Sequence, residues 1–130
     1  MATVTSKLTL SSSDLTSQNL SLSLSKAISA SHTTGLARTK VGQTAVHADA
    51  ALLYTADDYA AIAYVYIKNT DSTATNYIYV YDDTTSGDPV ILKLAGGDFA
   101  FMPTNADKTL KAYGTNATSV VEFMVFGTDQ

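Results

Sequence analysis

The acidic turn between Asp82 and Pro89 is the segment of this sequence with the clearest ligand chemistry. Asp82, Asp83 and Asp88 surround Gly87, and several carboxylates on one turn hold Ca²⁺ through oxygen ligands. Their spacing differs from that of an EF-hand loop, in which the ligands occupy alternate positions along twelve residues. The three aspartates are therefore weak candidates for a metal site, and a solvated turn is the favoured interpretation.

The other reactive residue types do not fall into a catalytic motif. His32 and His47 are too far apart for the His-x-x-x-His spacing of a metal site. No serine has the Gly-x-Ser-x-Gly surroundings of a nucleophile elbow. Gly96-Gly97 lacks the Lys-Ser/Thr that follows a phosphate-binding loop, and a β-turn explains it. We therefore expect no catalytic residue, no enzymatic activity and no cofactor.

The composition and net charge of the chain argue against nucleic acid and membranes as partners. The chain has 130 residues, no cysteine and a formal net charge of −4. Nucleic acid and anionic membrane surfaces attract concentrated Lys/Arg patches, whereas the eight basic residues here are scattered. The first ten residues lack both a basic start and an apolar stretch, so we expect no secretory signal and synthesis in a cytoplasm. Neither nucleic acid nor a membrane is an expected partner.

The elements that carry these residues are predicted to be strands. Serine and threonine make up 32 of the residues, Glu and Arg occur once each, and apolar residues recur with period two. Turn residues follow at intervals of roughly ten residues, which is typical of sandwiches. The sequence therefore predicts an all-β fold, an antiparallel β-sandwich that is jelly-roll-like and has an extended N-terminal arm. Strands are expected at 7–10, 20–25, 36–41, 46–54, 60–68, 77–82, 90–94, 98–102, 110–113 and 120–126, with a helical turn as the alternative within 46–54.

The first 34 residues differ from the rest because they are rich in Ser and Leu and almost free of aromatic residues. We expect residues 1–34 to form an arm or outer strands and residues 35–130 to form the sandwich domain. Leu20, Leu22 and Leu24 alternate with serine, which is typical of a half-buried strand. We predict that the arm packs on a neighbouring subunit, with these leucines in the interface.

Two hairpins are predicted in the second half of the chain. Residues 60–68 and 77–82 flank a polar stretch and are expected to pair, with their aliphatic residues in the core. Residues 90–94 and 98–102 are expected to pair around Gly96-Gly97, with Pro103 ending the second strand. The first hairpin would collect its tyrosines on one outer face. These are Tyr64, Tyr66, Tyr77, Tyr79 and Tyr81.

The tyrosine row has three interpretations. An exposed ladder on a solvated sheet is one, because cross-strand aromatic pairs stabilise a sheet by themselves. An interface with another protein is the second, because tyrosine is enriched at such contacts. A face that binds carbohydrate is the third, although the chain has no tryptophan.

The last predicted strand, 120–126, is apolar on both faces except for Glu122, the only glutamate in the chain. A nearly continuous apolar run is typical of a central strand covered on both sides. We therefore expect Glu122 at a sheet surface or paired with a lysine such as Lys93 or Lys111.

The C-terminal half resembles the small structural proteins of tailed bacteriophages, above all those that decorate or cement the capsid. The similarity lies in a strand, a glycine turn, an aromatic strand that ends in proline and a closing strand "VEFMVFG". The segments that carry it are Val90–Leu94, Gly96–Pro103, Leu110–Tyr113 and Val120–Phe126.

This resemblance implies a non-enzymatic protein that decorates and stabilises a phage capsid through contacts between subunits. The capsid shell is then the alternative to a neighbouring subunit as the surface on which residues 1–34 pack. The resemblance also implies a homo-oligomer, the major capsid protein or other virion subunits as partners, and a place in the virion after assembly in the host cytoplasm. A structural component of the phage tail or neck is one alternative. A carbohydrate-binding, adhesive β-sandwich is the other.

Overall fold

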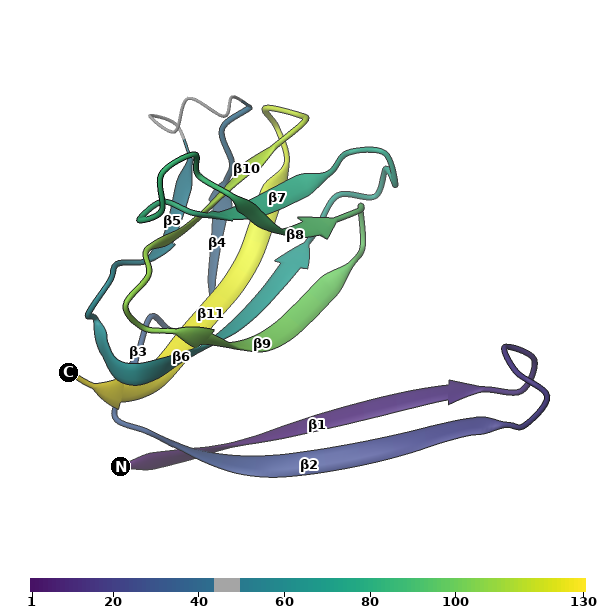
Figure 1. The fold of residues 1–130 in the computed structure, drawn as a ribbon. Helices are drawn as coiled ribbons and strands as arrows, with labels where there is room; N and C mark the ends of the chain where they lie inside the picture. The colour runs from purple at the N-terminus through teal and green to yellow at the C-terminus, as the bar shows by residue number, and fades with distance from the viewer. Residues whose placement is uncertain (44–49) are drawn as a thin grey trace.

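Strands form wherever the sequence alternates, and the part of the chain described by the computed structural model contains no helix (Figure 1). The structure describes residues 1–43 and 50–130. Within these ranges there is accordingly no helix that could cross a membrane. His47 and the first part of the predicted strand 46–54 lie outside the described residues. The strands are β1 (Ala2–Ser12), β2 (Leu20–Ala30), β3 (His32–Thr33), β4 (Ala37–Lys40), β5 (Ala51–Tyr54), β6 (Tyr59–Asn69), β7 (Ile78–Asp82), β8 (Val90–Leu94), β9 (Phe99–Asn105), β10 (Leu110–Gly114) and β11 (Val120–Asp129).

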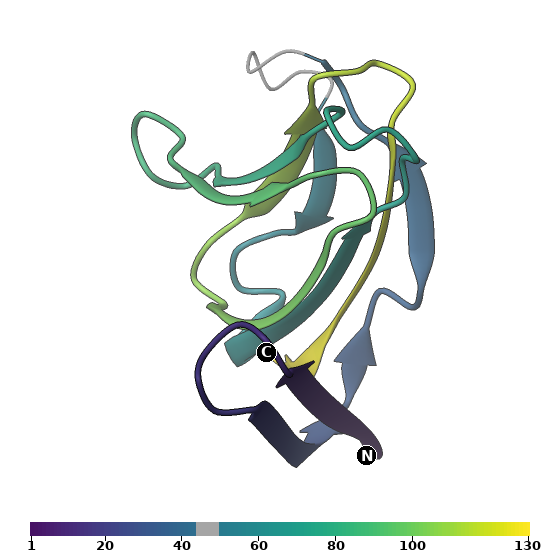
Figure 2. The ribbon, with the colours of Figure 1, turned by 90° about the vertical axis from the view of Figure 1, so that its right-hand side faces the viewer.

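After the first two strands, the chain builds two packed sheets (Figures 1 and 2). The β6 sheet has the order β9-β6-β11, with β3 and β4 both paired to the far edge of β11. The β7 sheet has the order β5-β10-β7-β8. The antiparallel pairs are nested: β4 with β11, β5 with β10, β6 with β9, and β7 with β8. This nesting across two sheets is the jelly-roll pattern, and it confirms the predicted all-β, antiparallel sandwich.

The core lies between the two sheets and is aliphatic. Val65 and Ile67 of β6 face Ile78 and Val80 of β7, and all four side chains are fully buried. The alternation in the sequence predicted these inward positions, since successive side chains of a strand point to opposite faces. β11 is a central strand, as expected, with β6 on one side and β3 and β4 on the other.

Both predicted hairpins are wrong. Residues 60–68 and 77–82 do not pair, because β6 and β7 lie in different sheets and the polar segment between them crosses the sandwich. Residues 90–94 and 98–102 do not pair either, because β8 joins β7 and β9 joins β6. A loop that crosses between sheets needs the same turn-forming residues as a loop that turns back within one.

Pro103 does not end its strand, which continues to Asn105. β9 is an edge strand that pairs only with β6, and Pro103 lies opposite Tyr64 in that pairing. Proline is accommodated on an edge strand because one of its edges has no partner that needs a donor.

A buried side chain ties the two sheets together at one end of the sandwich. Asn69, the last residue of β6, is fully buried. Its Nδ2 donates to the carbonyl oxygens of Asn76 at 2.7 Å and Leu94 at 3.1 Å. Its Oδ1 accepts the backbone N–H of Asp71 at 3.1 Å. Because Leu94 ends β8, this one amide connects the end of the β6 sheet to the β7 sheet.

Candidate subunit interface

The first thirty residues form an amphipathic hairpin. β1 pairs antiparallel with β2 in a register that places Leu8 opposite Leu24 and Leu10 opposite Leu22. Residues directly opposite each other share a face of the sheet, and their neighbours point the other way. One face is therefore mainly aliphatic, and the other is mainly serine and threonine. We call the outer part of the aliphatic face the leucine face: Leu8, Leu10, Leu20, Leu22 and Leu24.

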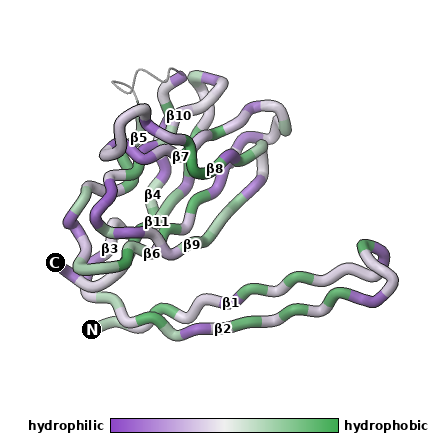
Figure 3. Tube along the Cα trace, in the orientation of Figure 1, coloured by the Kyte–Doolittle hydropathy of each residue, from purple (hydrophilic) through white to green (hydrophobic). Residues whose placement is uncertain are grey.

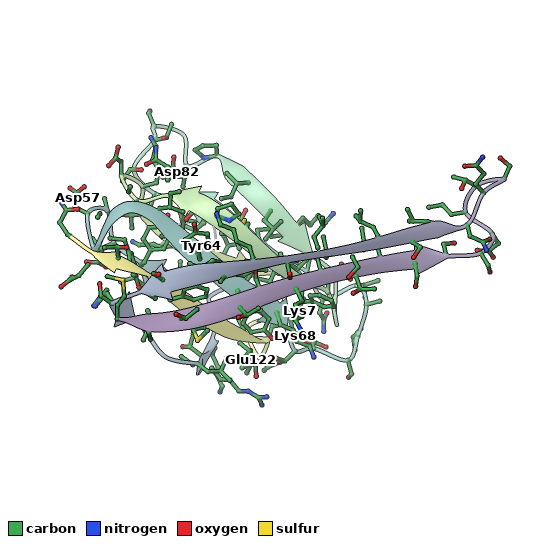
Figure 4. The ribbon with its side chains drawn as sticks, turned by 90° about the horizontal axis from the view of Figure 1, so that it is seen from below. Lys7, Asp57, Tyr64, Lys68, Asp82 and Glu122 are labelled. Atoms are coloured by element: carbon green, nitrogen blue, oxygen red, sulfur yellow. The ribbon has the colours of Figure 1, made fainter. Side chains whose placement is uncertain are left out.

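The inner end of the hairpin is fixed to the outer surface of the β6 sheet. Ile28 and Ala30 are buried and cluster with Phe126, with Val4, Tyr64 and Met124 packed around them. The chain then bonds to β11, where the Ser31 N–H donates to the Gly127 carbonyl at 2.9 Å. Figure 4 shows the hairpin crossing this sheet in front of Tyr64.

The leucine face lies beyond this contact and is uncovered. The hairpin projects past the sandwich in Figure 1, and Figure 3 shows hydrophobic residues along both of its strands. Leu8 is 47% exposed and Leu24 is 57% exposed, although the aliphatic residues at the inner end are buried. Leucine face and sandwich are separated by a groove of about 500 Å³. Its apolar lining comes from Leu8, Leu10 and Leu24 of the hairpin and Phe99 to Phe101 of β9.

Charges occur only at the two ends of this surface. Lys26 lies at the inner end of the leucine face, whereas Lys7 lies beside Leu8 on the opposite face of the hairpin, and both lysines line the groove. Asp14 lies in the loop at the tip, where the Ser12 hydroxyl donates to its carboxylate at 3.0 Å. The hairpin therefore presents an uncharged apolar middle between a basic end and an acidic end.

The interface residues predicted from sequence are not all brought together. Leu20, Leu22 and Leu24 do share one face, as their alternation requires. Sequence reasoning missed Leu8, Leu10, Phe99 and Phe101, although Leu-Thr-Leu and Phe-Ala-Phe carry the same period-two signal. The sequence does not show that β1 pairs with β2, or that β9 lines the groove beside the leucine face.

The tyrosines do not form the predicted row. Tyr64 and Tyr66 lie on the outer side of the β6 sheet, whereas Tyr77 and Tyr79 lie on the β7 sheet. Tyr81 lies on the same face of β7 as Tyr79 and is fully buried there beside Tyr113, with the two ring centroids 5.6 Å apart. The single tyrosine platform on which the carbohydrate-binding alternative depended is therefore absent.

The half-buried tyrosines already have partners within the chain. The Tyr79 ring stacks on Tyr113 with centroids 5.2 Å apart, and Lys93 Nζ lies 4.1 Å from the centroid of the Tyr77 ring. Tyr64 stacks on Phe126 at 5.6 Å. Contact of Tyr64, Tyr66, Tyr77 and Tyr79 with another subunit stays a prediction.

Glu122 pairs with Arg38, which corrects the expected pairing with Lys93 or Lys111. Arg38 stands opposite Glu122 in the β4–β11 register, and its Nη2 lies 2.7 Å from Oε2. Tyr66 donates its hydroxyl to Oε1 at 2.8 Å. These hydrogen bonds, first that of Tyr66 and then that of Arg38, lower the pKa of Glu122. The carboxylate thus holds β4, β11 and β6 together on the outer side of the sheet.

The acidic turn is occupied by the protein's own donors. The Asp82 carboxylate accepts the Thr84 N–H at 2.8 Å and the hydroxyls of Thr84 and Thr85, and Lys108 Nζ lies 3.7 Å away. Asp83 pairs with Lys111 at 2.9 Å. In residues 1–43 and 50–130, no group of three or more acidic or histidine side chains is placed to hold a metal ion. Asp82 therefore holds the β7–β8 turn, and Asp83 joins this turn to β10.

The pH dependence of stability provides a test of the Asp82 hydrogen bonds. Burial by itself raises the pKa of Asp82, but the hydroxyls of Thr84 and Thr85, the Thr84 N–H and the charge of Lys108 together outweigh it and lower the pKa to about 2. The ionised form therefore stabilises the fold above the unfolded pKa near 4, and this stabilisation is lost as the pH falls through 2. We expect Asp82→Asn to lower the free energy of unfolding by about 2 kcal/mol at pH 7 and by almost nothing at pH 2. Urea unfolding at both pH values measures the difference, and a difference that does not change with pH would contradict the assignment.

Comparisons with known proteins leave the family open. No protein-family model matches the chain, and no curated protein sequence matches it. One solved structure is similar in its backbone, a chain from Bacillus endospore appendages, which are described as a family of disulfide-linked pili. The TM-score is 0.49 and the sequence identity is 12%, over 98% of this chain and 89% of that chain. A similarity at this level carries no argument about function, so function has to be inferred from the surfaces of the molecule.

Proposed function

We propose that this chain is a non-enzymatic structural subunit that assembles with other protein subunits through its N-terminal hairpin. The observation that carries the proposal is the leucine face, in which five leucines are one-third or more exposed on a strand pair that projects from the sandwich. A hairpin of two strands has too little core to be held together by its own side chains. Contiguous apolar surface of this kind is typical of sites where another protein binds.

The place of assembly that we propose is the particle of a tailed bacteriophage, where the chain would decorate and stabilise the capsid. This part of the proposal rests on the resemblance of residues 90–126 to small decoration proteins. The major capsid protein or other virion subunits would then be the partners, and assembly would take place in the host cytoplasm. A position in the tail or neck is the alternative within the same class.

Two measurements test the proposal, one for assembly with other subunits and one for binding to a phage capsid. The first is the mass of the purified chain in solution, by light scattering, and we expect a mass above 13.7 kDa. The second is co-sedimentation with capsids that lack the chain, purified from the phage that encodes it, and we expect the chain to pellet with them. A chain that is monomeric and stays in the supernatant would overturn the proposal. Self-association without capsid binding would leave the structural role and overturn the capsid assignment.

A further inference from the structure

We infer that the leucine face pairs with the leucine face of a second copy of this chain, in a two-fold symmetric dimer. The inference rests on the proposed assembly role, and it identifies a second copy of the chain as the partner that binds the hairpin. Three observations support it: the amount of exposed surface, the symmetry of the leucine face and the placement of charges along the hairpin.

The chain exposes more surface than a monomer of its size usually does. A folded monomer of 13.7 kDa is expected to expose about 6,600 Å², whereas this chain exposes 7512 Å². The excess of roughly 900 Å² is close to the ~800 Å² that each partner contributes to a standard protein interface. The hairpin projects from the sandwich and exposes five leucines, so a second copy that covers its apolar side would remove part of this excess.

The leucine face is symmetric about its middle along β2, where Leu20 and Leu24 flank Leu22. Along β1, Leu8 on one side of Leu10 is matched by Ser12 on the other. A two-fold axis in the plane between two such faces, running across the strands at the Leu10–Leu22 pair, places Leu22 over Leu22 and Leu24 over Leu20. Contacts in which each patch meets its own copy are the rule for symmetric dimers. The serine and threonine side of each hairpin then faces water.

The same axis also brings opposite charges together. It runs the two hairpins in opposite directions, so the tip of each lies at the level of the other's inner end. Asp14 at one tip then approaches Lys26 on the partner, four residues on the inner side of Leu22. The tip also reaches the groove beside Phe99, which is 71% exposed in the single chain. A parallel arrangement would instead place lysine against lysine, which is unfavourable.

Charge substitution at the centre of the face tests the dimer. We expect the parent chain to have about twice the mass of 13.7 kDa by sedimentation equilibrium, and Leu22→Asp and Leu22→Lys each to be monomeric. Mixing these two variants should restore the dimer, because the axis places the two substituted positions together. Ser23→Asp, one residue along on the opposite face, is the matched control and should remain dimeric.

Disulfide cross-linking gives a second measurement that does not place a charge in the hairpin. The chain has no cysteine, so Leu22→Cys introduces a single thiol. We expect it to form a cross-linked dimer on oxidation, whereas Ser23→Cys should not. A monomeric parent, or a parent whose dimer survives Leu22→Asp and does not cross-link through Leu22→Cys, would overturn the inference. A monomeric parent that binds capsids would overturn the dimer and leave the proposed function standing. A dimer that binds no capsids would leave the dimer and the structural role standing and overturn the capsid assignment.

Discussion

Replacing Asn69 by leucine is expected to lower the free energy of unfolding by about 3 kcal/mol. The substitution keeps the size of the side chain and removes three hydrogen bonds, those to the carbonyls of Asn76 and Leu94 and from the N–H of Asp71. Each net hydrogen bond contributes about 1 kcal/mol, and a buried polar group left without a partner costs about 1–3 kcal/mol. The loss is therefore larger than that of an ordinary surface substitution.

The effect is large because the fully buried Asn69 amide bonds two separate segments at one end of the sandwich. Asn69 lies at the end of β6, and its amide bonds the end of β8 in the other sheet. Its backbone adds two further bonds: its N–H donates to Asp98, and its carbonyl accepts from Gly97, both at 2.9 Å. Loss of the side chain therefore loosens the 70–77 and 95–98 loops together. Thermal unfolding should show the midpoint falling by about 10 °C for a chain of this length.

Asn105 provides the matched control. Its Oδ1 accepts the N–H of Asp107 at 2.9 Å, the same local bond that Asn69 makes to Asp71, but Asn105 is exposed. Asn105→Leu should therefore cost less than about 1 kcal/mol, since water replaces the lost bond. If the two variants unfold at the same denaturant concentration, Asn69 does not connect the sheets in the way described.

The strands and their inward faces could be predicted from sequence because both depend on local pattern. Val65, Ile67, Ile78 and Val80 alternate with other residues, and all four are buried as the period of two requires. Tyr81 keeps the face that alternation assigns to it, since Tyr79 and Tyr81 both contact the Tyr113 ring, but it is fully buried there. Its burial depends on β10, a pairing partner that local pattern does not identify.

Strand pairing could not be predicted because the partners are far apart in the chain. β6 pairs with β9 and β11, whereas the pattern of two strands around a polar segment favours the sequence neighbour β7. Arg38 is the partner of Glu122 for the same reason, since β4 and β11 come from opposite ends of the sandwich sequence. The sequence indicates that Glu122 needs a partner of opposite charge. The strand pairing of the jelly roll determines that this partner is Arg38.

The exposure of the leucines in the hairpin does not follow from the local sequence pattern. The alternation of Leu20, Leu22 and Leu24 with serine predicts a half-buried strand, yet these leucines are between 36% and 57% exposed in the single chain. At the inner end the same pattern is satisfied, because Ile28 and Ala30 are buried against Phe126. The alternating aliphatic side chains are thus buried where the hairpin contacts the sandwich and exposed where it does not. A binding partner would bury the exposed ones.

Replacing Leu8, Leu10, Leu22 and Leu24 together by threonine is expected to weaken assembly roughly a hundredfold. Each of these leucines leaves between a third and three-fifths of its surface exposed. Complete burial of a leucine contributes about 1.5–3 kcal/mol, so partial burial of four contributes about 3 kcal/mol after the costs of association. That free energy corresponds to about two decades in the dissociation constant. Light scattering over a dilution series measures the association of the chain with itself, and co-sedimentation measures its binding to capsids.

The folded monomer should be almost unaffected, and this separates an interface role from a structural one. Threonine has high strand propensity and the four positions make no core contact, so the unfolding midpoint should change by less than the shift expected for 1 kcal/mol. The control exchanges hydroxyl residues on the opposite face, as Thr9→Ser with Ser21→Thr, Ser23→Thr and Ser25→Thr, and should assemble normally. If the leucine variant assembles as well as this control, another surface joins the subunits. If it instead loses several degrees of thermal stability in the monomeric state, the leucines stabilise the hairpin itself, and the alternation in β2 reflects folding of the single chain.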